Sequence, residues 1–111
     1  MVRRSCIVGV GSYLPARILT NKDIEAIVDT SDEWIVQRTG IRQRHVVAEG
    51  ESTSDLALAA ARQALERAGM PASALDLIVL ATTTPDHTFP ATATKVQAAL
   101  GMTGGAAFDV Q

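Results

Sequence analysis

A nearly continuous apolar run at residues 75–81 constrains the fold of this chain more than any other feature. Such a run is typical of a strand in a parallel sheet that is covered on both faces. Helix patterns flank it, one at residues 52–68 with a capping-box spacing at its start and one predicted from Pro90 to Gly101. A further apolar strand is predicted at residues 106–111. Because strands alternate with helices, the sequence predicts an α/β fold with an open parallel sheet.

The first part of the chain contains shorter elements. Residues 5–10 form an apolar run that is expected to be a buried strand, and residues 41–48 alternate weakly, as a short exposed strand would. Between them we expect two short helices. Asn21 is predicted to cap the first, and Thr30 with Glu33 has the spacing of a capping box for the second, which ends near Gly40.

Composition excludes several classes of protein. The 111 residues are 47% apolar and 20% charged, which is typical of one small globular domain and not of a disordered tail. The net charge of −2 argues against binding to nucleic acid or to an anionic membrane, and no apolar stretch reaches the roughly 20 residues of a membrane span. The single cysteine, Cys6, cannot form an internal disulfide. We therefore expect a cytoplasmic protein.

Charge is nevertheless distributed unevenly along the chain. Residues 1–45 carry seven Lys or Arg against five Asp or Glu, and the densest basic stretch runs from Arg38 through Arg42 to Arg44 and His45. An anionic ligand would therefore be held by this local patch.

Three patterns with possible chemistry favour structural roles. Gly9-x-Gly11 begins like a dinucleotide-binding fingerprint but lacks the third glycine, so it is interpreted as the exit of a strand. Cys6 lies in an apolar run without a neighbouring histidine and is interpreted as a small core residue, not a nucleophile. His87 and Asp86 follow the strand at 75–81, where a base or a metal ligand is plausible, but two residues make no metal site. A turn in which Asp86 bonds the local backbone is the favoured interpretation.

Trp34 and Arg38 form a more specific pair. They lie four residues apart on one predicted helix, hence on one face. An indole and a guanidinium plane could hold a heteroaromatic ring between them, with Arg42 and Arg44 neutralising phosphates, as a ligand such as coenzyme A would require. The alternative is a surface tryptophan covered by an arginine side chain.

Several motifs in this chain closely resemble the amino-terminal region of the beta-ketoacyl-acyl-carrier-protein synthase III family. The most specific is Asp32-Glu33-Trp34-Ile35 followed by Arg38-Thr39-Gly40-Ile41. The motifs are, in chain order, residues 9–15, 20–21, 29–41, 81–84, His87, 89–90 and 107–110. The resemblance covers essentially the whole chain.

The resemblance implies a thiolase-like fold, layered αβαβα in the complete protein, with residues 1–111 as most of its first half and the second half absent. It implies a homodimeric acyltransferase that condenses acetyl-coenzyme A, or another short acyl-coenzyme A, with malonyl-acyl carrier protein. No cofactor is implied beyond the coenzyme A thioester substrate. The family's catalytic cysteine, histidine and asparagine are expected outside this chain, so neither Cys6 nor His87 takes their place.

Carried over by residue, the resemblance places Thr30, Trp34 and Arg38 at the adenine-ribose end of coenzyme A. Phe89 matches a residue that closes the acyl pocket across the dimer interface. No catalytic residue and no metal ligand is assigned in this chain. Two alternatives stay open: a free-standing module that binds coenzyme A or a nucleotide without catalysis, and a related ketosynthase that makes polyketide, quinolone or hydroxymethylglutaryl-coenzyme A products.

Overall fold

The computed structural model describes all residues from Met1 to Gln111 and divides them into two compact units. The first, here called the parallel unit, comprises Met1–Tyr13 and Glu51–Gln111. The second, the antiparallel unit, comprises Leu14–Gly50. Each unit has its own two-stranded sheet. The parallel sheet predicted from the sequence lies in the parallel unit, where the runs at 75–81 and 106–111 pair.

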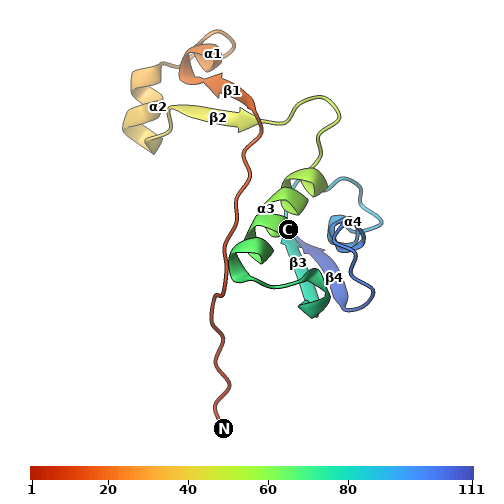
Figure 1. Cartoon of the computed structure of the whole chain (residues 1–111). Coiled ribbons are helices and arrows are strands. Elements are labelled where there is room, and N and C mark those ends of the chain that lie inside the picture. The colour runs from red at the N-terminus through yellow and green to blue at the C-terminus, as the bar shows by residue number, and fades with distance from the viewer. The chain divides into compact units, whose positions relative to one another are not determined.

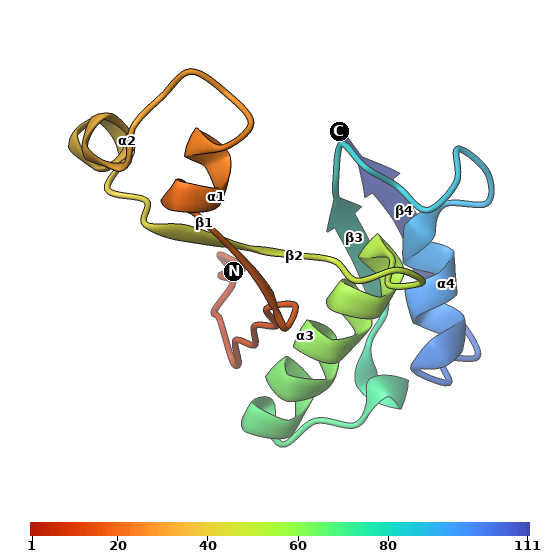
Figure 2. The same cartoon turned by 90° about the horizontal axis from the view of Figure 1, so that it is seen from above.

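The parallel unit contains the strand–helix–strand arrangement that the sequence predicts. Strands β3 and β4 point the same way in Figure 2 and pair in parallel, with Leu80 opposite Asp109. The elements are α3 (Thr53–Ala68), the 3-10 turn η1 (Ala72–Ala74), β3 (Leu77–Ala81), α4 (Thr92–Ala99) and β4 (Ala106–Val110), coloured green to blue in Figure 1. A parallel pair needs a crossover connection, which α4 supplies.

One face of this sheet carries the core. Leu80, Ala93 and Val96 are buried together, and partly buried residues from α3, from both strands and from the C-cap of α4 pack against them. The side chains of Val79 and Phe108 on the opposite face are 51% and 46% exposed. Alternating exposure along each strand follows from the two-residue period of a β-strand.

Helix α3 has the limits that the sequence predicts. Ser52 is its N-cap, and the carboxylate of Asp55 accepts hydrogen bonds from the amide and hydroxyl of Ser52. Gly69 ends the helix in the left-handed conformation, with a φ of 64° that glycine adopts without a steric cost.

The predicted start of α4 is wrong. The helix begins at Thr92, not at Pro90, and its N-cap Ala91 offers no side-chain acceptor. The carboxylate of Asp109 accepts from the amides of Thr92 and Ala93, both at 2.7 Å. A residue of the neighbouring strand therefore satisfies the free amides of this helix end, which no local pattern reveals.

The predicted strand at residues 5–10 is also wrong. This segment has no strand pairing and is largely exposed. It is held against α3 instead, because the Ser12 amide donates to the side chain of Gln63 and Arg67 donates to the carbonyl of Val10. A strand needs a hydrogen-bonded neighbour, and these 111 residues place none beside the segment.

The antiparallel unit pairs two strands that flank two short helices. The elements are β1 (Arg17–Thr20), α1 (Asn21–Glu25), α2 (Asp32–Thr39) and β2 (Gln43–Val46), with β1 antiparallel to β2. Strand β2 confirms the prediction for residues 41–48, whereas β1 was not predicted.

Both helix caps in this unit lie one residue from their predicted positions. Thr20, not Asn21, is the N-cap of α1, with its side chain accepting from the amide of Asp23. Ser31, not Thr30, caps α2 by accepting from the amide of Trp34. Neighbouring polar residues can all act as caps, so sequence alone does not choose between them. Gly40 ends α2 with a φ of 71°, as predicted.

Asn21 forms the buried polar centre of this unit. It is 1% exposed. Its amide nitrogen donates to Oδ1 of Asp32 at 2.7 Å and to the carbonyl of Ile41 at 2.8 Å, and its oxygen accepts from Arg44 at 2.7 Å. One side chain thereby connects α1, the start of α2 and β2.

Candidate functional site

The antiparallel unit contains a cavity of about 700 Å³ beside the start of α2. It combines apolar side chains with hydroxyls and one guanidinium group. The lining residues are Ile24, Val28, Asp29, Thr30, Ser31, Trp34, Ile35, Thr39 and Arg44. Two of the residues predicted to contact coenzyme A, Thr30 and Trp34, therefore line the same cavity.

Trp34 and Arg38 lie on one face of α2, as their spacing predicts. The guanidinium carbon of Arg38 is 5.1 Å from the centre of the Trp34 ring, within the range of a cation–π contact. A flat ring between the two would need them about 7 Å apart, twice an ordinary carbon contact. Arg38 thus covers one ring face, and a stacked ligand would need the other face. Trp34 is 53% exposed and has surface to offer it.

The basic residues after α2 differ in their surroundings. Arg44 lines the cavity and donates to Asn21, so it is oriented by the buried amide. Arg42 is exposed at the surface. His45 contacts the carbonyl oxygen of Pro15 through Nδ1 at 2.6 Å. Of the two arginines that the sequence suggests for phosphate binding, Arg44 is therefore fixed at the cavity and Arg42 faces solvent.

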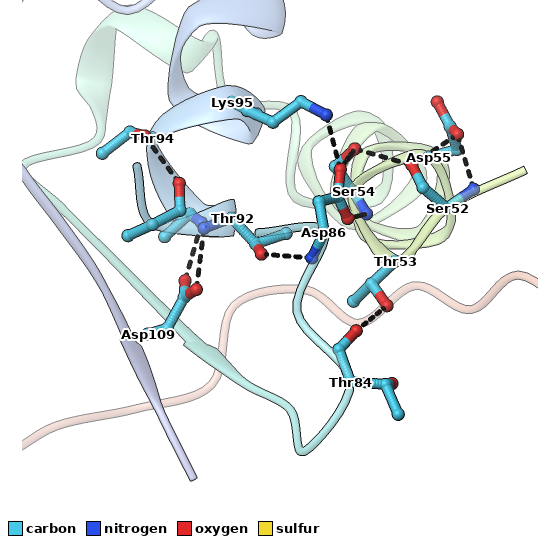
Figure 3. A network of polar contacts seen from close by, with 12 residues as sticks. Ser52, Thr53, Ser54, Asp55, Thr84, Asp86, Thr92, Thr94, Lys95 and Asp109 are labelled. Atoms are coloured by element: carbon cyan, nitrogen blue, oxygen red, sulfur yellow. Dashed lines mark hydrogen bonds and ion pairs between the residues drawn. The ribbon is translucent and has the colours of Figure 1, made fainter. Parts of the chain in front are cut away.

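The parallel unit brings polar groups together where β3 ends. Asp86 lies in the loop after β3, and its side chain is 3% exposed (Figure 3). Its carboxylate accepts from the amide of Ser54 at 2.9 Å and from the Ser54 hydroxyl at 2.6 Å. Lys95 of α4 completes the set with an ion pair. Asp86 thus joins the start of α3 to α4.

The charge state of Asp86 follows from these contacts. Burial acts to raise the pKa of this carboxyl group, but the hydrogen bonds from Lys95 and Ser54 outweigh it and hold the pKa well below the ordinary range. Asp86 is therefore ionised at neutral pH. The predicted local turn is wrong, because the backbone amide that Asp86 accepts from lies 32 residues earlier in the chain.

His87 and Phe89 follow Asp86 and are exposed, with 87% of Phe89 accessible. Both line a surface hollow of about 370 Å³ that Phe108 and Asp109 of β4 also border. No group of three or more His, Cys, Asp or Glu side chains in the chain is arranged to hold a metal ion.

Gly9 and Gly11 allow close packing against α3. A Cβ atom at Gly11 would lie 2.2 Å from the carbonyl oxygen of Ala60, and one at Gly9 would lie 2.6 Å from that of Ala64. The close approach of two backbones explains this glycine pair without a bound nucleotide. Cys6 is exposed, so its prediction as a core residue is wrong for the same reason as the strand that was to bury it.

None of the helices has the length and apolar character needed to cross a bilayer. No family model matches the chain. Individual relatives do. The beta-ketoacyl-[acyl-carrier-protein] synthase III of Rhodospirillum centenum is 70% identical over 111 residues, which is 100% of this chain and 34% of the relative. That of Hyphomonas neptunium is 68% identical over the same share of each chain. This chain belongs to the beta-ketoacyl-[acyl-carrier-protein] synthase III family.

Solved structures of that family agree with the assignment. The 3-oxoacyl-[acyl-carrier-protein] synthase III from Aquifex aeolicus superposes with a TM-score of 0.88 at 52% identity, over 94% of this chain and 33% of the other. A priming beta-ketosynthase from the R1128 polyketide biosynthetic pathway gives 0.87 at 36% identity, over 94% and 31%. The fold is therefore the thiolase-like α/β fold of these ketosynthases. The chain spans about a third of the length of the curated relatives it matches.

The sequence did not reveal that Asn21 connects three elements, nor did it reveal the contacts of Asp86 and Asp109. The partners of these side chains lie 9 to 32 positions away along the chain. A capping pattern relates residues three apart, so it cannot reveal such pairs.

Proposed function

We propose that this chain is part of an acyltransferase that initiates fatty acid biosynthesis. The reaction condenses acetyl-coenzyme A, or another short acyl-coenzyme A, with malonyl-acyl carrier protein and yields 3-oxoacyl-acyl carrier protein, carbon dioxide and free coenzyme A. The observation that carries the proposal is 70% identity over every residue of the chain to a beta-ketoacyl-[acyl-carrier-protein] synthase III.

Within that enzyme, residues 1–111 are proposed as the N-terminal part of the first thiolase-like half. The nucleophilic cysteine, the histidine and the asparagine of the family lie outside them in this proposal. The exposed Cys6 and the exposed His87 share no contact that would activate a thiol, which supports leaving both without a catalytic role.

The proposed role of the antiparallel unit is to bind the adenine-ribose end of coenzyme A. Thr30 and Trp34 line the cavity beside α2, and the uncovered face of the Trp34 ring is available for stacking. Arg38 supports the ring from its other face. The thioester is a substrate here, and the proposal includes no cofactor.

The proposed role of Phe89 is to close the acyl pocket of a second copy across a homodimer interface. Its 87% exposure in a single chain supports this, because a large apolar side chain presented to solvent is typical of a binding surface. Acyl carrier protein is the proposed protein substrate and the cytoplasm the proposed location.

The test is covalent labelling of the full-length protein with acetyl-coenzyme A, followed by intact-mass measurement and peptide mapping. One added acetyl group on a cysteine beyond Gln111 is expected. A label on Cys6, or no covalent label, would overturn the mechanism. A Cys6→Ser variant that labels as well as the wild type serves as the control.

A related ketosynthase that primes polyketide synthesis is the second candidate, because the R1128 enzyme shares the fold at 36% identity. Turnover of the full-length protein with malonyl-acyl carrier proteins from fatty acid and polyketide systems separates the two. A binding module without catalysis would bind coenzyme A and release no carbon dioxide with either carrier.

A further inference from the structure

The loop between β3 and α4 is fixed at both ends and unsupported in its middle. At one end, Thr53 donates to the carbonyl of Thr84 at 2.6 Å, and the carboxylate of Asp86 accepts from Ser54 and Lys95. At the other end lies Thr92, which is fully buried and begins α4. Figure 3 shows both sets of contacts.

The two ends are also joined to each other. The backbone amide of Asp86 donates to Oγ1 of Thr92 at 3.1 Å, and the amide of Thr92 donates to Asp109 at 2.7 Å. Between these anchors, residues 87–90 form no hydrogen bond with the rest of the chain. We call residues 87–90 the tip of the loop. Its position therefore depends on Asp86 and Thr92, the two residues that anchor the loop on either side of it.

Asp86 is the anchor with the most connections. It contacts Ser54 in the first turn of α3 and the side chain of Lys95 in α4. It therefore sets the distance between these two helices and the direction in which the tip extends from the loop. An ionised carboxylate with three donors makes stronger hydrogen bonds than neutral groups do. Phe89 lies three residues later with no contact of this kind.

We propose that Asp86, held by Ser54 and Lys95, is a positioning residue that sets the location of Phe89 and thereby the acyl-chain preference of the enzyme. The proposal rests on the function proposed above, in which Phe89 closes an acyl pocket. It adds a residue that contacts neither acyl group nor coenzyme A but determines where the closing side chain lies.

The test compares Asp86→Asn, Phe89→Ala and the double variant in the full-length enzyme, with Asp76→Asn as the matched control. Asp76 is exposed and lies before β3. The readout is the ratio of kcat/KM for a two-carbon to that for a six-carbon acyl-coenzyme A. For Asp86→Asn we expect this ratio to change about tenfold, the factor that loss of one charge-assisted hydrogen bond gives. Phe89→Ala should change it in the same direction, and the double variant should match Phe89→Ala alone.

Two results would overturn the proposal. One is an equal loss of kcat/KM for both chain lengths in Asp86→Asn, which a purely structural role predicts. The other is an effect that adds to that of Phe89→Ala. If Asp86→Asn does not fold, Lys95→Gln replaces it, since the Lys95 side chain is 44% exposed, and a smaller change in the same direction is expected.

Failure of the proposed function gives a different result. The wild-type enzyme would then condense neither acyl-coenzyme A. In that case, the rate of proteinase K cleavage between residues 86 and 92 still shows how firmly the tip is held. Cleavage about tenfold faster in Asp86→Asn than in Asp76→Asn is expected when one charge-assisted hydrogen bond holds the tip. Equal cleavage rates would overturn the positioning role.

Discussion

The two units of this chain place their buried polar groups differently. In the antiparallel unit, one uncharged side chain, Asn21, connects α1, the start of α2 and β2 through three hydrogen bonds. In the parallel unit, an apolar core forms between sheet and helices, and two carboxylates, Asp86 and Asp109, hold the starts of α3 and α4. The first unit thus depends on one central residue, whereas the second divides the same task between its core and its helix ends.

Asn21→Leu is expected to lower stability the most, and it tests whether the antiparallel unit depends on this one residue. Removing the amide leaves Asp32 and Arg44 without their buried partner, which costs about 3 kcal/mol of local stability. Hydrogen exchange of the full-length protein should show faster exchange throughout β1 and β2 and little change in β3 and β4. Gln43→Leu, at an exposed position of β2, is the control. Faster exchange in both units alike would contradict the division.

Gly11→Ala tests packing in the parallel unit. The added methyl group would lie 2.2 Å from a backbone oxygen of α3, and such overpacking costs about 2 kcal/mol. Gly104→Ala has open space at its Cβ position and serves as the control. Exchange at the amides of α3 reports the difference. Equal exchange in the two variants would show that residues 9–11 do not pack on α3.

Asp109→Ala removes the carboxylate at the start of α4. We expect a loss of about 1.5 kcal/mol, as for removal of an N-cap side chain. The first turn of α4 should exchange faster, while α3 keeps its protection because Asp86 still holds it. Asp76→Asn controls for the loss of a negative charge. Faster exchange in both helices would show that the two carboxylates do not act separately.

The pH dependence of the Asp86 anchor follows from its lowered pKa. A group whose folded-state pKa is lowered stabilises the protein above its unfolded pKa, about 3.9 for Asp, and loses this contribution as the pH falls further. Stability of the α3 start should therefore stay constant from pH 7 to about 5 and fall below about pH 4. The measurement is hydrogen exchange at Ser54 against pH. Asp86→Asn should weaken the dependence and leave the part that comes from Asp55, whose pKa the hydrogen bonds from Ser52 also lower. A midpoint near pH 6 would contradict this role of Asp86.

Trp34→Ala should change stability least, by less than about 0.5 kcal/mol, because its side chain is half exposed. Its effect is expected on ligand binding. Loss of one stacking contact should raise KM for acetyl-coenzyme A about tenfold and leave the acyl-chain preference unchanged. Val47→Ala, at an exposed apolar position in the same unit, is the control. An unchanged KM would remove Trp34 from the proposed site.

Sequence patterns predicted most helices and strands of both units, but they missed β1 and wrongly predicted a strand at residues 5–10. The limits of α3 and the pairing of β3 with β4 follow from local caps and from apolar runs, which the structure retains. The start of α4 could not be predicted, because its amides are satisfied by Asp109 from another strand. The hydrogen bonds of Asn21 could not be predicted for the same reason, because its partners lie in other elements. Of the candidate site, the shared face of Trp34 and Arg38 was predictable from their spacing, but their direct contact was not.

In the proposed function, the antiparallel unit binds the adenine-ribose end of coenzyme A. The most direct measurement is hydrogen exchange of the full-length protein with and without free coenzyme A. We predict slower exchange in α2, from Asp32 to Thr39, which Trp34→Ala abolishes. Slower exchange at α4 and the loop before it, with α2 unchanged, would contradict the assignment.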